Sequence, residues 1–507
     1  MRAENSLKNA AAAWSGQLLS LIIKFVSRTI FVMILSEEYL GVNGLFSNIL
    51  SMLSLAELGV GVAIVYSMYR PIAQNDEEKI IALMQFYKKV YTAIGIFILV
   101  VGSCLTPFLS VFVKEMPDIE YLQVIYLLYV LNSGASYFFS YKASFITANQ
   151  KNYIVTIINN LMSALTVTAQ IIVLAITKNF ILYVAVQVVG TVITNAVISW
   201  YANKHYPVLK KKEKKPLEEA TLNEIKKNTK AMLMHKIGGI IVFSTDNIIL
   251  SKFVGLAVVG IYSNYVLLIE SIEKVLEQIF FAITPGIGNL AVCENEDRSY
   301  DVFKTTFLIN FWVYSFSAIC FFNLMNPFIS LWLSEKYLFA FGIVTILCIN
   351  FYIKGMRKTV QTFSNAMGLF WYNRYVPLFE SVINIIFSIV LSLKLGAAGV
   401  FIGTFISTMT TCFIAEPWVV FKYGLNKKMR LYMIKYAIFT VVGLATNALV
   451  YFLCGLATGD GIMPFVLKML VCAVVPNVVY IIVFARTNEF KYILSVIKRI
   501  TKKIFRR

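Results

Sequence analysis

The chain has 507 residues, of which 58% are hydrophobic and only 14% are charged, and its 46 Lys and Arg against 27 acidic residues give a formal net charge of +19. Soluble domains carry about a quarter charged residues because their surfaces face water. This composition excludes a water-soluble globular enzyme. A fused ATPase is also excluded, since no segment matches the phosphate-binding pattern GxxxxGK[ST].

Fourteen apolar stretches are long enough to cross a bilayer, whose hydrocarbon core needs about 20 helical residues. The composition therefore predicts an all-α polytopic membrane protein with about 14 transmembrane helices. The expected spans are 11–34, 41–66, 90–113, 121–141, 153–176, 181–202, 231–251, 258–285, 305–325, 337–353, 376–393, 397–421, 431–457 and 465–485.

The distribution of basic residues predicts the orientation. With the N-terminus placed inside, the inside segments hold 35 of the 46 Lys and Arg and the outside connections hold five. Cytoplasmic loops of membrane proteins are enriched in these residues. Both termini are therefore expected in the cytoplasm, and the net charge needs no nucleic acid partner. With two scattered histidines and seven cysteines lacking a CxxC pair, we expect no metal site and no cofactor.

Three segments of the first half return in the second half in the same order. GLFSN at 44–48 returns as GIYSN at 260–264, and TPFLSVFV at 106–113 returns as NPFISLWL at 326–333. VGTVIT at 189–194 returns as IGTFIS at 402–407. Six helices per repeat is an even number, so the two repeats share one orientation and are parallel.

The repeats predict the domain organisation. We expect two parallel six-helix bundles joined by a basic cytoplasmic linker, followed by two further helices and a basic amphipathic tail that lies on the anionic inner leaflet. The corresponding residues are 1–202 and 231–421 for the bundles, 203–230 for the linker, 422–485 for helices 13 and 14, and 486–507 for the tail.

Charged residues inside the predicted spans cluster in the first two helices of each half. Such residues are costly in lipid and usually face a bundle interior or a wet cavity. Lys24 and Arg28 lie one turn apart in the first helix without an acid in reach, which favours binding of an anionic group such as phosphate. Pairing of Arg28 with Asp246 of the matching helix is the alternative.

The second half carries the larger group of charges. Lys236 and Lys274 are expected to help bind the anion. Candidate coupling or cavity residues are Glu57 of the first half and His235, Asp246, Glu270, Glu273 and Glu277 of the second half. Glu270 and Lys274 have the spacing of an intrahelical pair, which is equally compatible with a structural role. Glu273 and Glu277 repel each other unless one is protonated or faces a cation. Glu380 receives no assigned role.

The 6+6+2 arrangement and three segments resemble the bacterial polysaccharide transporters of the multidrug/oligosaccharidyl-lipid/polysaccharide exporter (MOP) superfamily. These segments are YLGVNGLFSNILSMLSLAELGVGVA (39–63), STDNIILSKFVGLAVVGIYSNY (244–265) and NPFISLWL (326–333). The resemblance implies a non-enzymatic flippase in the bacterial cytoplasmic membrane, which moves an undecaprenyl-pyrophosphate-linked oligosaccharide by alternating access. It also implies a cavity lined by helices 1, 2, 7 and 8.

The expected partners are this lipid-linked oligosaccharide, the phospholipid bilayer, H⁺ or Na⁺ as a coupling ion, and the polysaccharide polymerase machinery. A multidrug or toxin antiporter of the same superfamily and a lipid II flippase are the alternatives. The basic first helix disfavours cationic cargo, and its lack of an acid departs from the lipid II flippase pattern. A membrane enzyme would need a large outside loop with acid or base residues. A non-transporting scaffold would tolerate the loss of Glu273 and Arg28 together.

Overall fold

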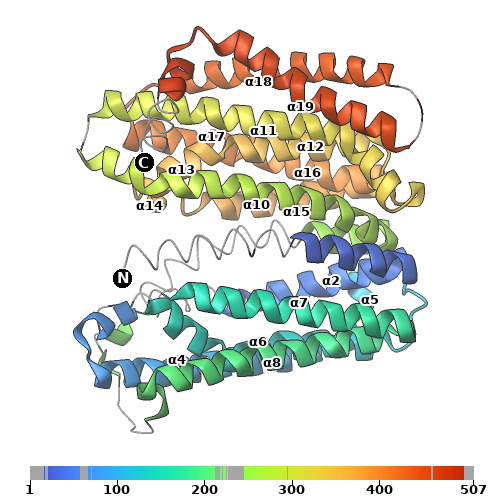
Figure 1. The fold of residues 1–507 in the computed structure, drawn as a ribbon, viewed down its shortest axis with the longest axis vertical. Coiled ribbons are helices and arrows are strands. Elements are labelled where there is room, and N and C mark those ends of the chain that lie inside the picture. The colour runs from blue at the N-terminus through green and yellow to red at the C-terminus, as the bar shows by residue number, and fades with distance from the viewer. Residues whose placement is uncertain are drawn as a thin grey trace. The chain divides into compact units, whose positions relative to one another are not determined.

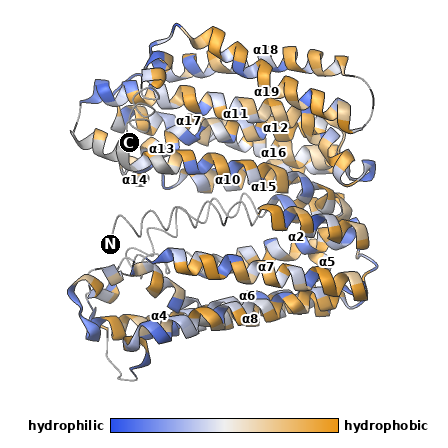
Figure 2. Cartoon of the chain, in the orientation of Figure 1, coloured by the Kyte–Doolittle hydropathy of each residue, from blue (hydrophilic) through white to orange (hydrophobic). Residues whose placement is uncertain are grey.

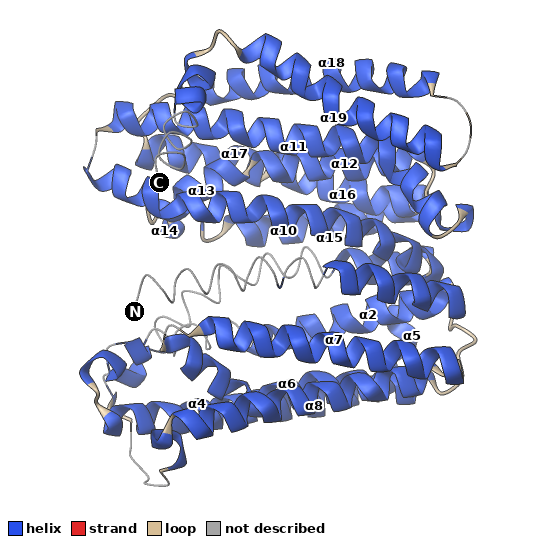
Figure 3. Cartoon of the chain, viewed as in Figure 1, coloured by secondary structure: helices blue, strands red, loops and turns tan. Residues whose placement is uncertain are grey.

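A computed structural model gives the fold of the chain (Figure 1). It describes residues 21–57, 71–149, 151–211, 245–293, 295–457 and 461–495, with short pieces at 16, 67–69, 217–219, 221–223, 225 and 459. Within these ranges the regular structure is helical throughout, without a strand (Figure 3). The predicted all-α class is therefore confirmed.

The chain divides into two compact units, Met1–Gly260 and Ile261–Arg507. The predicted bundle and linker boundaries remain predictions. The described elements of the first unit follow helix 21–34. They are α2 (Glu37–Leu53), η1 (Ser54–Glu57), α4 (Glu77–Cys104), η2 (Thr106–Phe108), α5 (Leu109–Phe112), α6 (Leu122–Ala148), α7 (Asn152–Thr177), α8 (Phe180–His205), η3 (Pro207–Lys210) and the π-helical η4 (Leu250–Val254).

The second unit contains most of α10, which begins just before the boundary, and ends with two long helices. Its elements are α10 (Leu256–Cys293), α11 (Glu296–Trp332), η5 (Glu335–Tyr337), α12 (Phe341–Met356), α13 (Lys358–Ala366), α14 (Phe370–Asn373), α15 (Val376–Leu395), α16 (Ala397–Thr410), α17 (Cys412–Val419), the π-helical η6 (Val420–Gly424), α18 (Met429–Leu456) and α19 (Ile462–Phe484).

Among the described residues, nine helices are long and apolar enough to cross a membrane, and a tenth span results if the bent pair within α6 is counted. These ten correspond to ten of the predicted spans. Predicted spans 11–34, 41–66 and 231–251 run into residues outside the described ranges. The remaining span, 337–353, corresponds to α12, whose 16 residues measure about 24 Å, shorter than the hydrocarbon core. The polytopic fold is confirmed, and the count of 14 remains a prediction.

Several helices extend beyond the predicted spans. α4 begins at Glu77, 13 residues before the predicted span, because Asp76 caps its N-terminus and accepts a hydrogen bond from the Lys79 amide at 3.0 Å. Hydropathy locates only the apolar part of such a helix. Figure 2 shows hydrophobic residues along most of the helices and hydrophilic residues mainly at helix ends and connections.

α15 and α16 pack closely because small residues line their contact. Gly399 and Gly403 of α16 form a GxxxG pattern, and a Cβ at either position would lie within 2.6 Å of α15 backbone atoms. Such close approach is typical of helices that associate in membranes. It allows Ser388 Oγ to donate to the Val400 carbonyl at 3.1 Å and the Asn384 amide to donate to Thr404 Oγ1 at 3.0 Å.

An aromatic core joins α11, α18 and α19. Phe303, Phe307 and Phe311 follow one face of α11 and are at most 2% exposed. The first turn of the predicted tail packs here as well, since the Phe490 ring stacks on Trp312 with centroids 5.9 Å apart. Glu489 forms an ion pair with Lys435 of α18. Tail residues 496–507 lie outside the described ranges.

The described part of the linker packs on α4. Ile225 is buried in the core cluster that contains Tyr87 and Tyr91. Lys211 pairs with Glu77, and Lys79 Nζ lies 2.9 Å from Glu218. The hydrogen bond from Lys79 holds the pKa of Glu218 below its ordinary value.

Candidate functional site

Helix 21–34 carries the predicted phosphate-binding residues of the first unit. Lys24 is exposed and Arg28, one turn later, is half-buried. Phe31 lies on the same helical face. Its ring meets those of Phe180 and Tyr183 of α8 edge-on at 5.7 and 5.5 Å. This packing fixes the rotation of the helix, and the Arg28 guanidinium interacts electrostatically with Tyr183.

Glu57 lies in the turn η1 at the end of α2. Its Oε1 accepts a hydrogen bond of 2.8 Å from the hydroxyl of Tyr91 on α4. Tyr91 is 4% exposed, and its ring centroid lies 5.0 Å from that of the buried Tyr87. Tyrosines therefore form part of the surroundings of this half-buried carboxylate.

The predicted residues of helix 7 are only partly described. Asp246 is buried in the short helix 245–249, which leads into η4. His235 and Lys236 lie outside the described residues. The proposed pairing of Arg28 with Asp246 stays a prediction.

α10 carries three acid–lysine pairs in the second unit. Glu270 and Lys274 form the intrahelical pair that their spacing predicts, at 3.3 Å. Glu273 pairs with Lys354 at 2.9 Å, and Glu277 pairs with Lys358 at 2.5 Å.

The two lysines that face Glu273 and Glu277 come from the end of α12 and the start of α13. Each of the two like charges on α10 therefore faces its own cation, which removes the repulsion that the sequence implies. Lys354 and Lys358 have the same four-residue spacing as the two glutamates, and this spacing is the signal that could have identified them.

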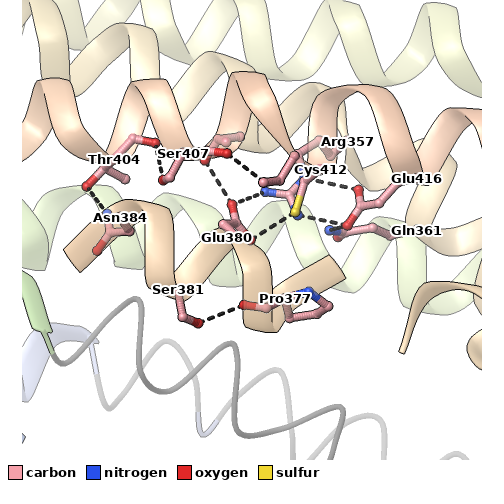
Figure 4. A network of polar contacts seen from close by, with 12 residues as sticks. Arg357, Gln361, Pro377, Glu380, Ser381, Asn384, Thr404, Ser407, Cys412 and Glu416 are labelled. Carbon is pink, nitrogen blue, oxygen red and sulfur yellow. Dashed lines mark hydrogen bonds and ion pairs between the residues drawn. The ribbon is translucent and has the colours of Figure 1, made fainter. Parts of the chain in front are cut away.

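Arg357, between these two lysines, connects two further carboxylates (Figure 4). Its Nε and Nη2 donate to Glu416 of α17 at 3.0 and 2.8 Å, and its Nη1 donates to Glu380 of α15 at 3.2 Å. The three side chains are only 10–12% exposed. Gln361 adds a hydrogen bond of 3.3 Å to Glu416.

Glu380 has two more partners. Thr408 donates to its Oε1 at 2.9 Å, and the Cys412 thiol lies 2.9 Å from its Oε2. We call Arg357, Glu380, Cys412 and Glu416 the α12–α17 network. Glu380 has no predicted role, and Arg357 lies between the predicted spans 337–353 and 376–393, because contacts between residues 23 to 59 positions apart have no local spacing signal.

The segment 354–358 therefore forms ion pairs with three other helices. Its three cations, Lys354, Arg357 and Lys358, face four carboxylates on α10, α15 and α17. The lysine pairs are balanced and partly exposed, whereas the buried part around Arg357 holds one guanidinium against two carboxyl groups. This arrangement links α10, α12, α13, α15 and α17 through charged side chains.

Solved structures of transporters share this fold. The lipid II flippase MurJ in an inward closed conformation is similar with a TM-score of 0.67 and 14% identity, covering 94% of this chain and 98% of that chain. An inward-facing multidrug resistance MATE family transporter of the MOP superfamily is similar with a TM-score of 0.62 and 15% identity, covering 80% and 94%.

A MOP superfamily transporter from Pyrococcus furiosus, described as having a binding pocket of reverse polarity, has a TM-score of 0.53 and 13% identity and covers 84% of this chain and 97% of its own. Together these similarities define a polytopic membrane protein with the fold of the MOP transporters.

The family follows from the sequence itself. The model of the polysaccharide biosynthesis protein family matches residues 6–290, more than half of the chain. The chain belongs to this family, which confirms the predicted family resemblance. No curated protein matches the sequence significantly.

Proposed function

We propose that the protein is a flippase that moves an undecaprenyl-pyrophosphate-linked oligosaccharide from the cytoplasmic to the outer leaflet of the bacterial cytoplasmic membrane, with both termini in the cytoplasm. The observation that carries this proposal is membership of the polysaccharide biosynthesis family together with a MOP-type fold. Such a cargo has a glycan head that cannot cross hydrocarbon unaided, because each unsatisfied polar group costs several kcal/mol there.

Lys24 and Arg28 support an anionic cargo. They lie one turn apart on one face of helix 21–34, and the Arg28 guanidinium lies near the phenol of Tyr183. Lys24 and Arg28 bind the pyrophosphate, assisted by Lys236 and Lys274, while the prenyl tail stays in the lipid. The two bundles then rock between inward-open and outward-open states. No covalent bond forms or breaks in this cycle.

In this mechanism the acidic residues serve the cavity and ion coupling rather than anion binding. Glu57, His235, Asp246, Glu270, Glu273 and Glu277 line the cavity or take part in ion coupling. The partly exposed pairs Glu270–Lys274 and Glu277–Lys358 supply both signs of charge on one face of α10. Cation entry then drives export, since one charge crossing 100 mV releases about 2.3 kcal/mol.

Reconstituted proteoliposomes test the cargo class. We expect translocation of an undecaprenyl-pyrophosphate-linked oligosaccharide, slower translocation of lipid II, and no efflux of a cationic dye. Preferential lipid II transport would favour the lipid II flippase alternative, which the MurJ similarity supports. Dye efflux without glycolipid movement would favour the multidrug alternative, which the MATE similarity supports, and would refute the proposal.

A further inference from the structure

Three polar contacts follow one another along the line where α6 and α8 meet. The first two are neutral and join Asn132 with Thr191 at 2.7 Å and the Ser136 carbonyl with the Asn195 amide at 3.3 Å. The third, near the ends of both helices, is charged, since Lys142 Nζ donates to Ser199 Oγ at 2.7 Å. Ser199 is 9% exposed and Lys142 is half-buried. The ammonium group of Lys142 is therefore held in a helix contact instead of extending into water.

In the described part of the chain, no acid balances the charge of Lys142. Lys88 of α4 acts on it electrostatically, and this interaction is repulsive because both groups are cations. Neither lysine contacts a carboxylate among the residues that the structure describes. Glu57 of the same unit accepts a hydrogen bond from Tyr91 instead. A half-buried cation beside a like charge is costly unless an anion binds between them.

These side chains lie at the level where the hydrocarbon core is predicted to end. Lys88 stands two residues before its predicted span, Lys142 directly follows its own, and Ser199 lies three residues before the end of the next. Trp200 belongs to the same level, because its exposed ring lies 5.0 Å from the Lys204 ammonium group. Tryptophans are enriched at the membrane–water interface, where lipid headgroups lie. The anion that fits these lysines is therefore one found at headgroup depth.

The surface of α8 next to this site is apolar and exposed. Val189, Val192, Ile193 and Trp200 recur at helical spacing, and each is at least 44% exposed. An exposed apolar stripe on a membrane protein borders the acyl chains. An anion that reaches Lys142 along this face comes from the bilayer, which favours a lipid phosphate over a soluble ion.

We propose that Lys88, Lys142 and Ser199 bind the phosphate of an anionic phospholipid of the cytoplasmic leaflet, at a site formed by α4, α6 and α8. The leaflet follows from the predicted orientation. Basic pockets between transmembrane helices on the cytoplasmic side recognise such headgroups. Ser199 Oγ accepts from Lys142, so its own hydroxyl proton is available to the phosphate. The two ammonium groups supply the charge-assisted hydrogen bonds.

The site follows a bend in α6. The pieces Leu122–Phe138 and Ser140–Ala148 differ in direction by 41°, and Lys142 lies in the second piece. A phosphate held by Lys88 and Lys142 ties this piece to α4 and removes the repulsion between the two lysines. The bound lipid therefore stabilises the bent end of α6 against the helices on either side of it.

Native mass spectrometry of the delipidated protein in detergent tests the site. We expect the first phosphatidylglycerol to bind more tightly than the first phosphatidylcholine, whose headgroup is neutral overall. Lys142→Met should raise the dissociation constant for phosphatidylglycerol about tenfold, the effect of losing one charged hydrogen bond, and Lys142→Arg should retain most of the affinity. The matched control is Lys89→Met, which removes an exposed cation about 100° further round α4 than Lys88 and should bind normally.

A second variant keeps the test decisive if Lys142→Met does not fold. Lys88 is exposed, so Lys88→Met should fold and should also weaken phosphatidylglycerol binding. Equal binding of the two phospholipids, or an equal loss in Lys89→Met, would overturn the site. Undecaprenyl phosphate, added in competition, distinguishes the source of the phosphate. If it binds more tightly than phosphatidylglycerol and depends on Lys142, the site belongs to the cargo and the phospholipid assignment is wrong. These measurements need no transport, so they stand apart from the proposed function.

Discussion

Arg357 shows how one residue connects distant helices. Its planar guanidinium reaches Glu380 and Glu416 at the same time, which a lysine cannot reproduce because it lacks the fork. Arg357→Met leaves two buried carboxyl groups without a cation. We expect a loss of about 3–5 kcal/mol in unfolding free energy, measured by thermal unfolding in detergent.

The matched control for this prediction is Lys427→Met. Lys427 pairs with Asp297 at 2.6 Å, but Asp297 is 80% exposed, so the melting temperature should stay close to that of the unsubstituted protein. Arg357→Lys should lie between the two variants. Equal melting temperatures for Arg357→Met and Lys427→Met would contradict the importance of the buried network.

At the scale of elements, the close α15–α16 contact depends on glycines, which have no side chain at the point of contact. In Gly403→Ala the new Cβ would lie 2.4 Å from Ser388 Oγ and 2.5 Å from its amide nitrogen. The helices must separate, and we expect a destabilisation of about 1–3 kcal/mol in thermal unfolding. Gly342→Ala is the control, since no atom lies within 4 Å of the added Cβ. An unchanged melting temperature for Gly403→Ala would show that the two helices do not pack this closely.

The contact between the linker and α4 is weaker than the α15–α16 contact, and it depends on pH. Lys79 and Glu218 are 33% and 69% exposed, so a double-mutant cycle with Lys79→Met and Glu218→Gln should give a small but favourable coupling at pH 7. Because Lys79 lowers the pKa of Glu218, this coupling is present above the ordinary glutamate pKa and disappears as the pH falls through the lowered value. Coupling that persists in strong acid would contradict an ionic contact.

The elements also show what sequence patterns can locate. Charge spacing within one helix predicts Glu270–Lys274 correctly, because residues four apart are neighbours on a helix surface. Ten of the fourteen spans predicted from hydropathy correspond to long apolar helices among the described residues, but hydropathy underestimates α4, whose capped first turns are polar. The Arg357 contacts with Glu380 and Glu416 have no equivalent signal, since they depend on how α12, α15 and α17 pack.

For the whole molecule, composition and charge placement predict the membrane class, and three repeated segments predict two parallel bundles. The family match and the similarity to MOP transporters confirm the class and the resemblance. The proposed cargo cannot be derived in this way, because recognition of a sugar depends on the shape of a binding cavity, which composition and repeats do not encode. The roles of Lys24, Arg28 and the α10 acids also remain predictions, since they depend on a bound substrate.

The most direct measurement is translocation of an undecaprenyl-pyrophosphate-linked oligosaccharide by purified Lys24→Ala and Arg28→Ala proteins in liposomes. Loss of cationic partners for the pyrophosphate should reduce the rate at least tenfold, corresponding to about 1.4 kcal/mol, with melting temperatures unchanged. Lys336→Ala, in the predicted outside connection, serves as the control and should translocate normally. Undiminished transport by both variants at equal reconstitution would contradict a basic first helix that receives a phosphorylated head group.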